Sequence, residues 1–314
     1  MSTAEHLQTV ACPELNWNID AIVAELRGLR EASLAARQRV GRPAKLPSKK
    51  ALATIVADLS SALFPNRFGT RDLARQSVDF YVGHLIDGAL RSLADEVLRE
   101  LHFMSTEDAS LEELRLQAVA VTRQFARRLP EIRLLLDSDI RATYEADPAA
   151  QSIDEILACY PGMTAITHYR LAHSLYDLGV PLVARIIAEI AHSLTGIDIH
   201  PSAEIQGSFS IDHGTGVVIG QRTVVGQRVR LCHGVTLGAN RRTGGEQGAP
   251  DAACHPIVED DVVIYAGATI LGPITIGRGA IIGGNVWLTR SVPPGAKVSQ
   301  AEVRTEEFAE GSGI

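Results

Sequence analysis

The last third of this 314-residue chain repeats with a strict period of six residues, which few folds can accommodate. After residue 257 an aliphatic residue recurs at every sixth position, in the row Val258, Ile264, Ile270, Ile276, Ile282 and Leu288. The companion row before residue 239 consists of Ile199, Ile205, Ile211, Val217, Thr223, Val229 and Val235. A period of six fits neither the turn of an α-helix nor the alternation of a strand. It is typical of hexapeptide repeats, in which three hexamers make one coil of a parallel β-helix and the aliphatic residues stack inside.

One segment interrupts this repeat. Residues 239–254 have no six-residue rhythm and are rich in Gly, Arg and Ala, so we predict a loop that leaves the β-helix at one corner. Loops carried by a rigid scaffold are common places for binding residues. Because the coils of a β-helix leave its ends and faces open, we also expect the chain to form a homo-oligomer.

The part of the chain before the repeat has helical periodicity. Apolar residues recur at helical spacing in the segments 19–39, 49–63, 78–101 and 180–194. A capping-box-like Ser110-Leu-Glu-Glu predicts a helix to about Arg128, and another helix is expected to begin at Ser152. Gly196 is an expected helix stop, and there the period changes to six. We therefore predict an α+β chain with an all-helical domain over 1–195, a β-helix domain over 196–298 and a flexible acidic tail over 299–314.

Composition excludes several classes of function. The net charge of −7 argues against a sequence-independent nucleic-acid binder, which needs a basic surface. No run of eighteen apolar residues is present, so a membrane span is not expected, and the first sixteen residues lack the apolar segment of a signal peptide. The four cysteines are scattered without CxxC spacing, which is typical of a reducing compartment and predicts a cytoplasmic protein.

The polar residues that interrupt the aliphatic rows are the candidates for chemistry. His213 falls at six-residue spacing before Ile219, so Asp212-His213 is expected to replace packing with polar groups at one corner. A carboxylate near an imidazole fixes its tautomer and stabilises its protonated form, as a general base near neutral pH requires. Asp198 lies fifteen residues before His213, close to one coil, and is predicted to approach it from the coil beneath. A lone histidine at a coil corner is more often a satisfied turn or interface residue.

At these residues the chain resembles a known family. The segments Gly196-Ile-Asp-Ile-His-Pro, Ile211-Asp-His-Gly-Thr-Gly and Ile282-Gly-Gly-Asn-Val-Trp-Leu closely resemble the serine O-acetyltransferases, in their longer-loop branch. The likeness is continuous over about 147–298 and looser in the helical domain. It implies a left-handed β-helix, assembled as a trimer or a dimer of trimers. It also implies acetyl transfer from acetyl-CoA to the L-serine hydroxyl, the first step of cysteine biosynthesis, with no permanently bound cofactor and no metal.

The resemblance also implies roles for individual residues. His213 matches the general base that removes the hydroxyl proton and later protonates the CoA thiolate, and Asp198 matches the carboxylate that orients its ring. Asp147, Asp212 and His255 match positions that hold the amino acid. The positions that match the groove for CoA between adjacent subunits are Ala239, Ala266 and Gly284.

One position departs from the family pattern. Where the family usually has an arginine that meets the serine carboxylate, immediately before the histidine of His-Pro, this chain has Cys254. We predict that Arg241 or Arg242 on the extruded loop replaces that arginine; otherwise the acceptor is not ordinary serine.

The C-terminal segment carries a second resemblance. The chain ends in Gly313-Ile314, similar to the terminus that serine acetyltransferases insert into the active site of O-acetylserine sulfhydrylase. A terminal carboxylate next to one apolar side chain can mimic an amino acid, so Ile314 is a candidate contact to that enzyme. The alternative is an acidic tail without a partner.

Three other functions stay open at this point. The first is a hexapeptide acyltransferase that acts on homoserine or a sugar. The second is a γ-class carbonic anhydrase, which needs three histidines on Zn²⁺. Candidate ligands for that metal would be His200, His213, His233 and His255. The third is a non-catalytic scaffold that binds the sulfhydrylase through Ile314.

Overall fold

The computed structural model describes residues 17–36, 45–69, 77–105, 110–239 and 254–300. By its internal packing the chain divides into two compact units, residues 1–45 and 46–314. Among its described residues the first unit contains one amphipathic helix, α1 (Ile19–Ala36), whose large apolar residues from Ile19 to Leu29 are exposed. This helix begins at the predicted residue, and residues 37–39 of the predicted helix lie outside the described residues. All other elements belong to the second unit.

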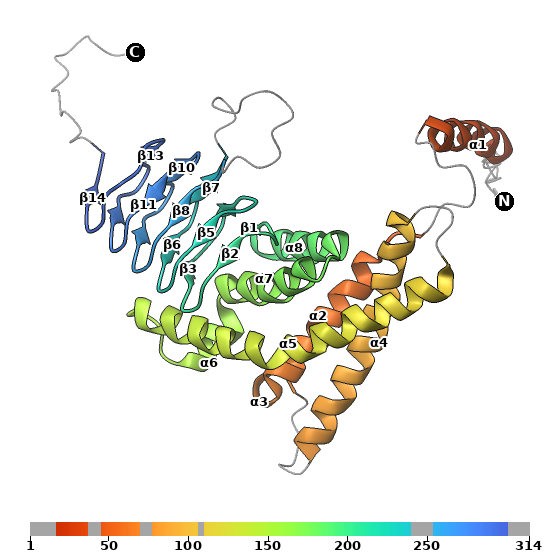
Figure 1. The fold of residues 1–314 in the computed structure, drawn as a ribbon, viewed down its shortest axis with the longest axis horizontal. Helices are drawn as coiled ribbons and strands as arrows, with labels where there is room; N and C mark the ends of the chain where they lie inside the picture. The colour runs from red at the N-terminus through yellow and green to blue at the C-terminus, as the bar shows by residue number, and fades with distance from the viewer. Residues whose placement is uncertain (1–16, 37–44, 70–76, 106–109, 240–253, 301–314) are drawn as a thin grey trace, which may run out of the picture. The chain divides into compact units, whose positions relative to one another are not determined.

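The second unit begins with helices (Figure 1). They are α2 (Lys49–Leu63), α3 (Pro65–Phe68), α4 (Val78–Met104), α5 (Leu111–Ala146), α6 (Ile153–Cys159), α7 (Pro161–Asp177) and α8 (Pro181–Thr195). α2 matches its predicted bounds, and α8 ends at Gly196, whose φ of 70° is the left-handed cap expected there. In Figure 1, α5, α7 and α8 lie against the first coil of the β-helix, in agreement with their contacts to β1 and β3.

Two of the longer helices differ most from the sequence prediction. α5 was expected to end near Arg128 but continues through Pro130 to Ala146, because Ile132, Leu136 and Ile140 keep the same apolar stripe buried. α7 was not predicted as a separate helix. Twelve of its seventeen residues are buried, so it has no polar face and gives little amphipathic signal.

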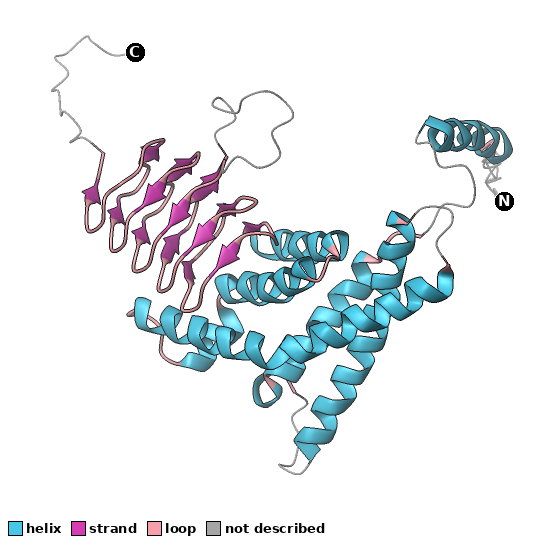
Figure 2. Ribbon diagram, viewed as in Figure 1, coloured by secondary structure: helices cyan, strands magenta, loops and turns pink. Residues whose placement is uncertain are grey.

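The strands form a parallel β-helix (Figure 2). They are β1 (Asp198–Ile199), β2 (Glu204–Ile205), β3 (Ser210–Asp212), β4 (Val218–Ile219), β5 (Val224–Val225), β6 (Arg230–Cys232), β7 (Thr236–Gly238), β8 (Ile257–Val258), β9 (Val263–Ile264), β10 (Thr269–Leu271), β11 (Thr275–Ile276), β12 (Ile281–Ile282), β13 (Trp287–Leu288) and β14 (Lys297–Val298). Sheet A has the order β1-β4-β7-β10-β13, sheet B the order β2-β5-β8-β11, and sheet C the order β3-β6-β9-β12-β14. Every pair is parallel, which confirms the fold predicted from the six-residue period.

The strand register corrects one aliphatic row. Ile211 pairs with Leu231, twenty residues later, whereas Ile219 pairs with Leu237, eighteen residues later. The coil that contains residues 212–216 is therefore two residues longer than the next coil. Ile199, Ile205 and Ile211 are the inward residues of the first three strands, but Val217 starts a different row, one that is buried at the corners. The single row proposed from the sequence was wrong. The inward row and the corner row are both apolar, so the two added residues let one six-residue count pass from the first row into the second unnoticed.

The same register corrects the expected position of His213. His213 does not replace an aliphatic residue, because Ile211 keeps the inward position opposite Leu231 and is 1% exposed. His213 lies instead within the longer corner that joins sheet C to sheet A. The polar residues of this corner therefore lie where the chain has two additional residues, and the aliphatic core continues without interruption.

The helices and the β-helix of the second unit share one core. A contiguous cluster of buried apolar side chains runs from Leu52 in α2 to Val292 after the last complete coil. Secondary structure changes between Thr195 and Asp198, as predicted, but a domain division at residue 195 remains a prediction because packing divides the chain only at residue 45. Within the described residues, no helix has the length and apolar character needed to cross a bilayer.

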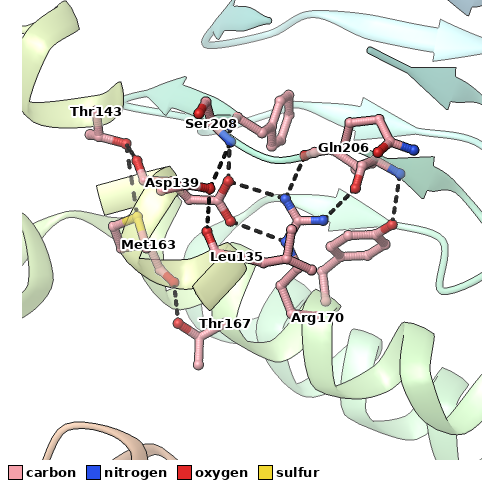
Figure 3. A network of polar contacts seen from close by, with 12 residues as sticks. Leu135, Asp139, Thr143, Met163, Thr167, Arg170, Gln206 and Ser208 are labelled. Carbon is pink, nitrogen blue, oxygen red and sulfur yellow. Dashed lines mark hydrogen bonds and ion pairs between the residues drawn. The ribbon is translucent and has the colours of Figure 1, made fainter. Parts of the chain in front are cut away.

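A buried ion pair connects the helices to the first coil (Figure 3). Arg170 of α7 donates from Nε and Nη2 to the two carboxylate oxygens of Asp139 in α5, each at 3.1 Å. Arg170 also donates to the carbonyl oxygens of Ile205 and Gln206. Asp139 accepts from the backbone N–H of Phe209 at 2.9 Å. Both charges are almost fully enclosed, so the pair holds two helices and two strand connections in one arrangement.

Candidate active site

The corner that carries His213 has a strained backbone. His213 has a φ of 56°, and the N–H of Gly214 donates to the carbonyl oxygen of Asp212 at 2.6 Å, closing a very tight turn. Gly214 has a φ of 89°, and a Cβ there would lie 2.3 Å from Cδ1 of Ile197. Non-glycine residues with positive φ cost about 1–3 kcal/mol and are concentrated at functional sites. A left-handed φ also occurs at ordinary corners, for example at Arg222 and Arg228, so what distinguishes this corner is that Gly214 and Gly216 follow His213 at positive φ in the same tight turn.

Asp212 is engaged by two neighbours on the adjacent coil. Its Oδ2 accepts a hydrogen bond from Nε of Arg230 at 2.6 Å and also contacts Nη2 of the same guanidinium. The Sγ of Cys232 lies 3.8 Å from the same oxygen. Burial lowers the pKa of Arg230, but the hydrogen bond and the charge of Asp212 outweigh it, and the pKa is raised above its usual value. Burial, followed by the charge of Asp212, raises the pKa of Cys232, so this thiol stays protonated.

Asp147, the residue after α5, approaches the same site from the helical side. The Tyr160 hydroxyl donates to its Oδ2 at 2.6 Å, and the Ala149 N–H donates to its Oδ1 at 2.9 Å. The Tyr160 bond and then the Ala149 bond lower the pKa of Asp147, and the charges of His213 and Arg230 act in the same direction. The same bond to Asp147 raises the pKa of Tyr160 to about 12. Asp147 is thus an ionised carboxylate close to His213 and Arg230.

His213 shares its corner with a second histidine and with a row of small residues. The ring centroids of His213 and His233 are 6.0 Å apart, at 69°. The next two coils place Ala266 and Gly284 at the same corner, linked by the hydrogen bond from Asn285 N–H to the Ala266 carbonyl oxygen at 2.8 Å. A Cβ on Gly284 would lie 3.2 Å from that oxygen. The corner therefore carries two imidazoles on its first coils. On the next two coils it carries the small residues Ala266 and Gly284, so that a ligand can come close to the backbone.

Asp198 and His255 lie at opposite edges of sheet A, Asp198 opposite Val218 at the edge that follows the His213 corner. The side chain of Asp198 on β1 is partly exposed, and its charge acts on His200, the residue that follows this strand. Among the described residues no hydrogen bond or ion pair joins Asp198 to His213. His255 lies at the corner between sheets A and B, where a Cβ on Gly220 would come within 2.9 Å of its Cδ2. Within one chain, Asp147, Asp212 and His213 are brought together, and His255 occupies a different corner.

The remaining candidate residues are placed as follows. Ala239 follows β7 at the same corner as His255, and Cys254, immediately before His255, is a partly exposed free thiol. Arg241, Arg242 and Ile314 lie outside the described residues. In the part of the chain that the structure describes, no three His, Cys, Asp or Glu side chains are close enough to hold a metal ion.

Sequence reasoning missed Tyr160, Arg230 and His233. Tyr160 precedes a helix that gave little signal, and its contact to Asp147 depends on how α5 and α7 pack. Arg230 is paired with Ser210, and its contact to Asp212 depends on how its side chain lies across the two neighbouring strands. His233 was considered only as a candidate zinc ligand, although its position one coil above the Asp-His-Gly turn was an available signal.

His200 is expected to make stability depend on pH. Burial, and then the positive charge of Arg185, lower its pKa to about 4, against 6.5 for an ordinary histidine. The unfolded chain therefore binds the proton more tightly, so this contribution is fully present above about pH 6.5 and is lost as the pH falls toward 4. Allowing for partial exposure, we expect a loss of about 1–2 kcal/mol in the free energy of unfolding through this residue. The measurement is the free energy of urea unfolding at about pH 7 and about pH 4.5 for the wild type and for His200→Asn. The contribution of His200 is the difference between the two proteins in how much that free energy changes with pH.

His200→Asn is the matched variant because its side-chain oxygen can accept the Ser202 N–H that Nδ1 of His200 accepts at 3.0 Å. It should show a smaller decrease in stability on acidification than the wild type. Equal decreases in both proteins would contradict this role of His200.

Comparison with known proteins supports one family. A family of bacterial transferase hexapeptide repeats (six repeats) matches residues 255–290. A serine acetyltransferase from a plasmid of Synechococcus elongatus is 51% identical over 305 residues, which cover 95% of this chain and 96% of that protein. The serine acetyltransferase of Mycobacterium tuberculosis is 49% identical over 160 residues, 51% of this chain and 67% of its own.

Solved structures agree with this assignment. Serine acetyltransferase 1 of Entamoeba histolytica in complex with L-cysteine has a TM-score of 0.68 and 34% identity, and the match covers 79% of this chain and 86% of that one. The Neisseria gonorrhoeae serine acetyltransferase in complex with serine has a TM-score of 0.52 and 27% identity, over 81% and 96% of the two chains. These matches confirm the predicted left-handed β-helix behind a helical region. The chain belongs to the serine acetyltransferase family and is a hexapeptide-repeat acyltransferase.

Proposed function

We propose that this chain transfers the acetyl group of acetyl-CoA to the hydroxyl of L-serine, giving O-acetyl-L-serine and CoA, the first step of cysteine biosynthesis. The observation that carries the proposal is the strained His213 corner beside the carboxylates of Asp147 and Asp212. Two carboxylates suit an acceptor with an ammonium group, and an imidazole near them suits removal of a hydroxyl proton. A sugar acceptor would offer no positive charge to these groups.

His213 is proposed to act as both base and acid. Its imidazole takes the serine hydroxyl proton while the oxygen attacks the thioester carbonyl carbon. When the tetrahedral intermediate collapses, the carbon–sulfur bond breaks and the imidazolium returns the proton to the CoA thiolate. Asp198 is proposed to orient the ring. It makes no hydrogen bond to His213 in the free chain, and catalytic hydrogen bonds often tighten only when substrates bind.

The donor substrate is proposed to lie along the corner above His213. Ala266 and Gly284 leave the backbone of this corner accessible to a narrow acyl-pantetheine arm. Ala239 lies at the other edge of sheet A, at the corner that carries His255. A groove that uses both edges fits CoA bound between two subunits.

A homo-oligomer, as a trimer or a dimer of trimers, is the proposed assembly. Large apolar side chains are exposed on the outside of the β-helix, among them Trp287 at 67% and Tyr265 at 47%. Assembly would cover them and could bring His255 of one subunit to His213 of its neighbour, which a single chain keeps on separate corners. Binding of O-acetylserine sulfhydrylase through Ile314, and action in the cytoplasm, remain proposals from the family resemblance.

The direct test is release of CoA thiol from acetyl-CoA with a panel of acceptors. We expect L-serine to give the highest kcat/KM, above homoserine and threonine by about 10-fold or more, because pocket contacts discriminate by about 1–3 kcal/mol per methylene. Sugars should give no turnover above hydrolysis. A preference for homoserine or a sugar would replace the proposed acceptor, and no turnover with any acceptor would favour the scaffold function.

A further inference from the structure

The ion pair between Asp212 and Arg230 uses only one oxygen of the carboxylate. All contacts to the carboxylate of Asp212 involve its Oδ2, which meets Nε and Nη2 of Arg230 and Sγ of Cys232. Within the described residues, Oδ1 of Asp212 and Nη1 of Arg230 make no hydrogen bond. The side chains are 14% and 34% exposed, so the pair is partly enclosed but reachable.

A pair with one free oxygen and one free N–H group is complementary to a zwitterion. An α-amino acid carries an ammonium and a carboxylate on the same carbon, and each needs a partner of opposite charge in a partly desolvated site. Guanidinium groups bind carboxylates through two parallel or forked hydrogen bonds, stronger than those between neutral groups. We propose that Arg230 binds the α-carboxylate of the acceptor while Asp212 holds its ammonium group. This inference rests on the proposed function.

The position of Arg230 is fixed before any ligand binds. Its backbone is in β6, paired with Ser210 of β3, and its guanidinium is held by Asp212 from the coil below. A side chain that is already ordered loses less conformational entropy on binding. Arg230 also acts on Asp147, because its charge contributes to the lowered pKa of that carboxylate. The guanidinium therefore lies beside Asp212, the residue before His213, and near enough to Asp147 for its charge to act there.

Neighbouring side chains are less suited to this role. Arg228, two residues earlier, donates from Nε and Nη2 to both oxygens of Asp261, at 2.6 and 3.0 Å, at another corner. Cys254 next to His255 carries no positive charge. Binding at Arg230 and Asp212 would leave the hydroxymethyl group of serine free to turn toward His213, the residue that follows Asp212. Arg230 is thus proposed to determine specificity for acceptors with a free carboxylate.

The experiment compares two acceptors that differ only in the carboxylate, L-serine and L-serinamide. Arg230→Gln should raise the KM for L-serine by about 10- to 100-fold, the range for a lost charge-assisted hydrogen bond, with little change for serinamide or acetyl-CoA. Arg230→Lys keeps the positive charge but lacks the planar guanidinium with its two adjacent donors. Its KM for L-serine should therefore lie between those of the wild type and Arg230→Gln. Arg228→Gln is the matched control and should behave like wild type.

Calorimetric titration of L-serine and serinamide into the full-length protein without acetyl-CoA makes the test independent of turnover. Wild type should prefer L-serine, and Arg230→Gln should lose that preference while its Tm stays within a few degrees. Equal losses for both ligands would overturn the proposal, because Arg230 would then only position Asp212. So would a preference that survives in Arg230→Gln but disappears in Arg241→Ala or Arg242→Ala. Carboxylate-dependent binding without CoA release would instead contradict the proposed function.

Discussion

His213→Asn is expected to lower kcat for CoA release by about 10²–10⁴-fold, the usual contribution of a general acid–base group. Asn cannot take the hydroxyl proton near neutral pH, but it tolerates the left-handed conformation that His213 adopts at a φ of 56°. The variant should therefore keep the corner and lose only the chemistry. The measurement is the rate of thiol release at saturating acetyl-CoA and L-serine.

The control for this variant is a histidine away from the corner. His192 in α8 is exposed and lies near Glu189, so His192→Asn should keep the activity of the wild type. The KM for acetyl-CoA should also stay unchanged in His213→Asn if the corner keeps its shape. Retention of more than about a tenth of wild-type kcat would show that another group removes the proton.

The second large effect is expected in the buried pair of Asp139 and Arg170. Asp139→Asn should reduce the free energy of unfolding by about 3–5 kcal/mol, because it leaves the charge of Arg170 enclosed without its counter-ion. Arg170 is 3% and Asp139 0% exposed, so water cannot substitute for the lost partner. Burial raises the pKa of Asp139, while Arg170 and the Phe209 N–H oppose that shift, so the ionised form depends on these contacts. Urea unfolding at about pH 7 measures the change.

An exposed ion pair provides the matched control. Asp87 and Arg91 form an i,i+4 pair on α4 with side chains 63% and 78% exposed. Asp87→Asn should leave the urea midpoint unchanged, since exposed pairs contribute little. If Asp139→Asn were as stable as Asp87→Asn, the buried pair would not be what holds α5 and α7 to the first coil.

The sequence predicted the β-helix because stacking requires an aliphatic residue at every strand, and that requirement is visible as a period of six. The position of His213 relative to the core was not predictable in this way, since Ile211 and Val217 are both apolar and belong to different rows. Helix α7 was not predicted for a related reason, because most of its residues are buried and its amphipathic pattern is weak.

In the candidate site, residues marked by a local sequence motif were predictable, whereas residues brought in by packing of distant segments were not. Asp212 and His213 were predictable because the glycine after them signals a local backbone shape. Tyr160 and Arg230 were not, because each reaches the site through a contact that depends on how separate segments pack. The pairing of Asp198 with His213 stays a prediction, since Asp198 lies at the edge of sheet A next to the His213 corner without a hydrogen bond to it.

The twenty-residue coil has a consequence for how such a site can arise. Each coil pairs with its neighbours strand by strand, so a change of length at one corner leaves the inward contacts above and below in register. Two extra residues are then enough to turn a purely structural coil into one that presents an imidazole and a carboxylate. In this architecture, a corner can therefore gain length and polar groups while the stacked core keeps its register.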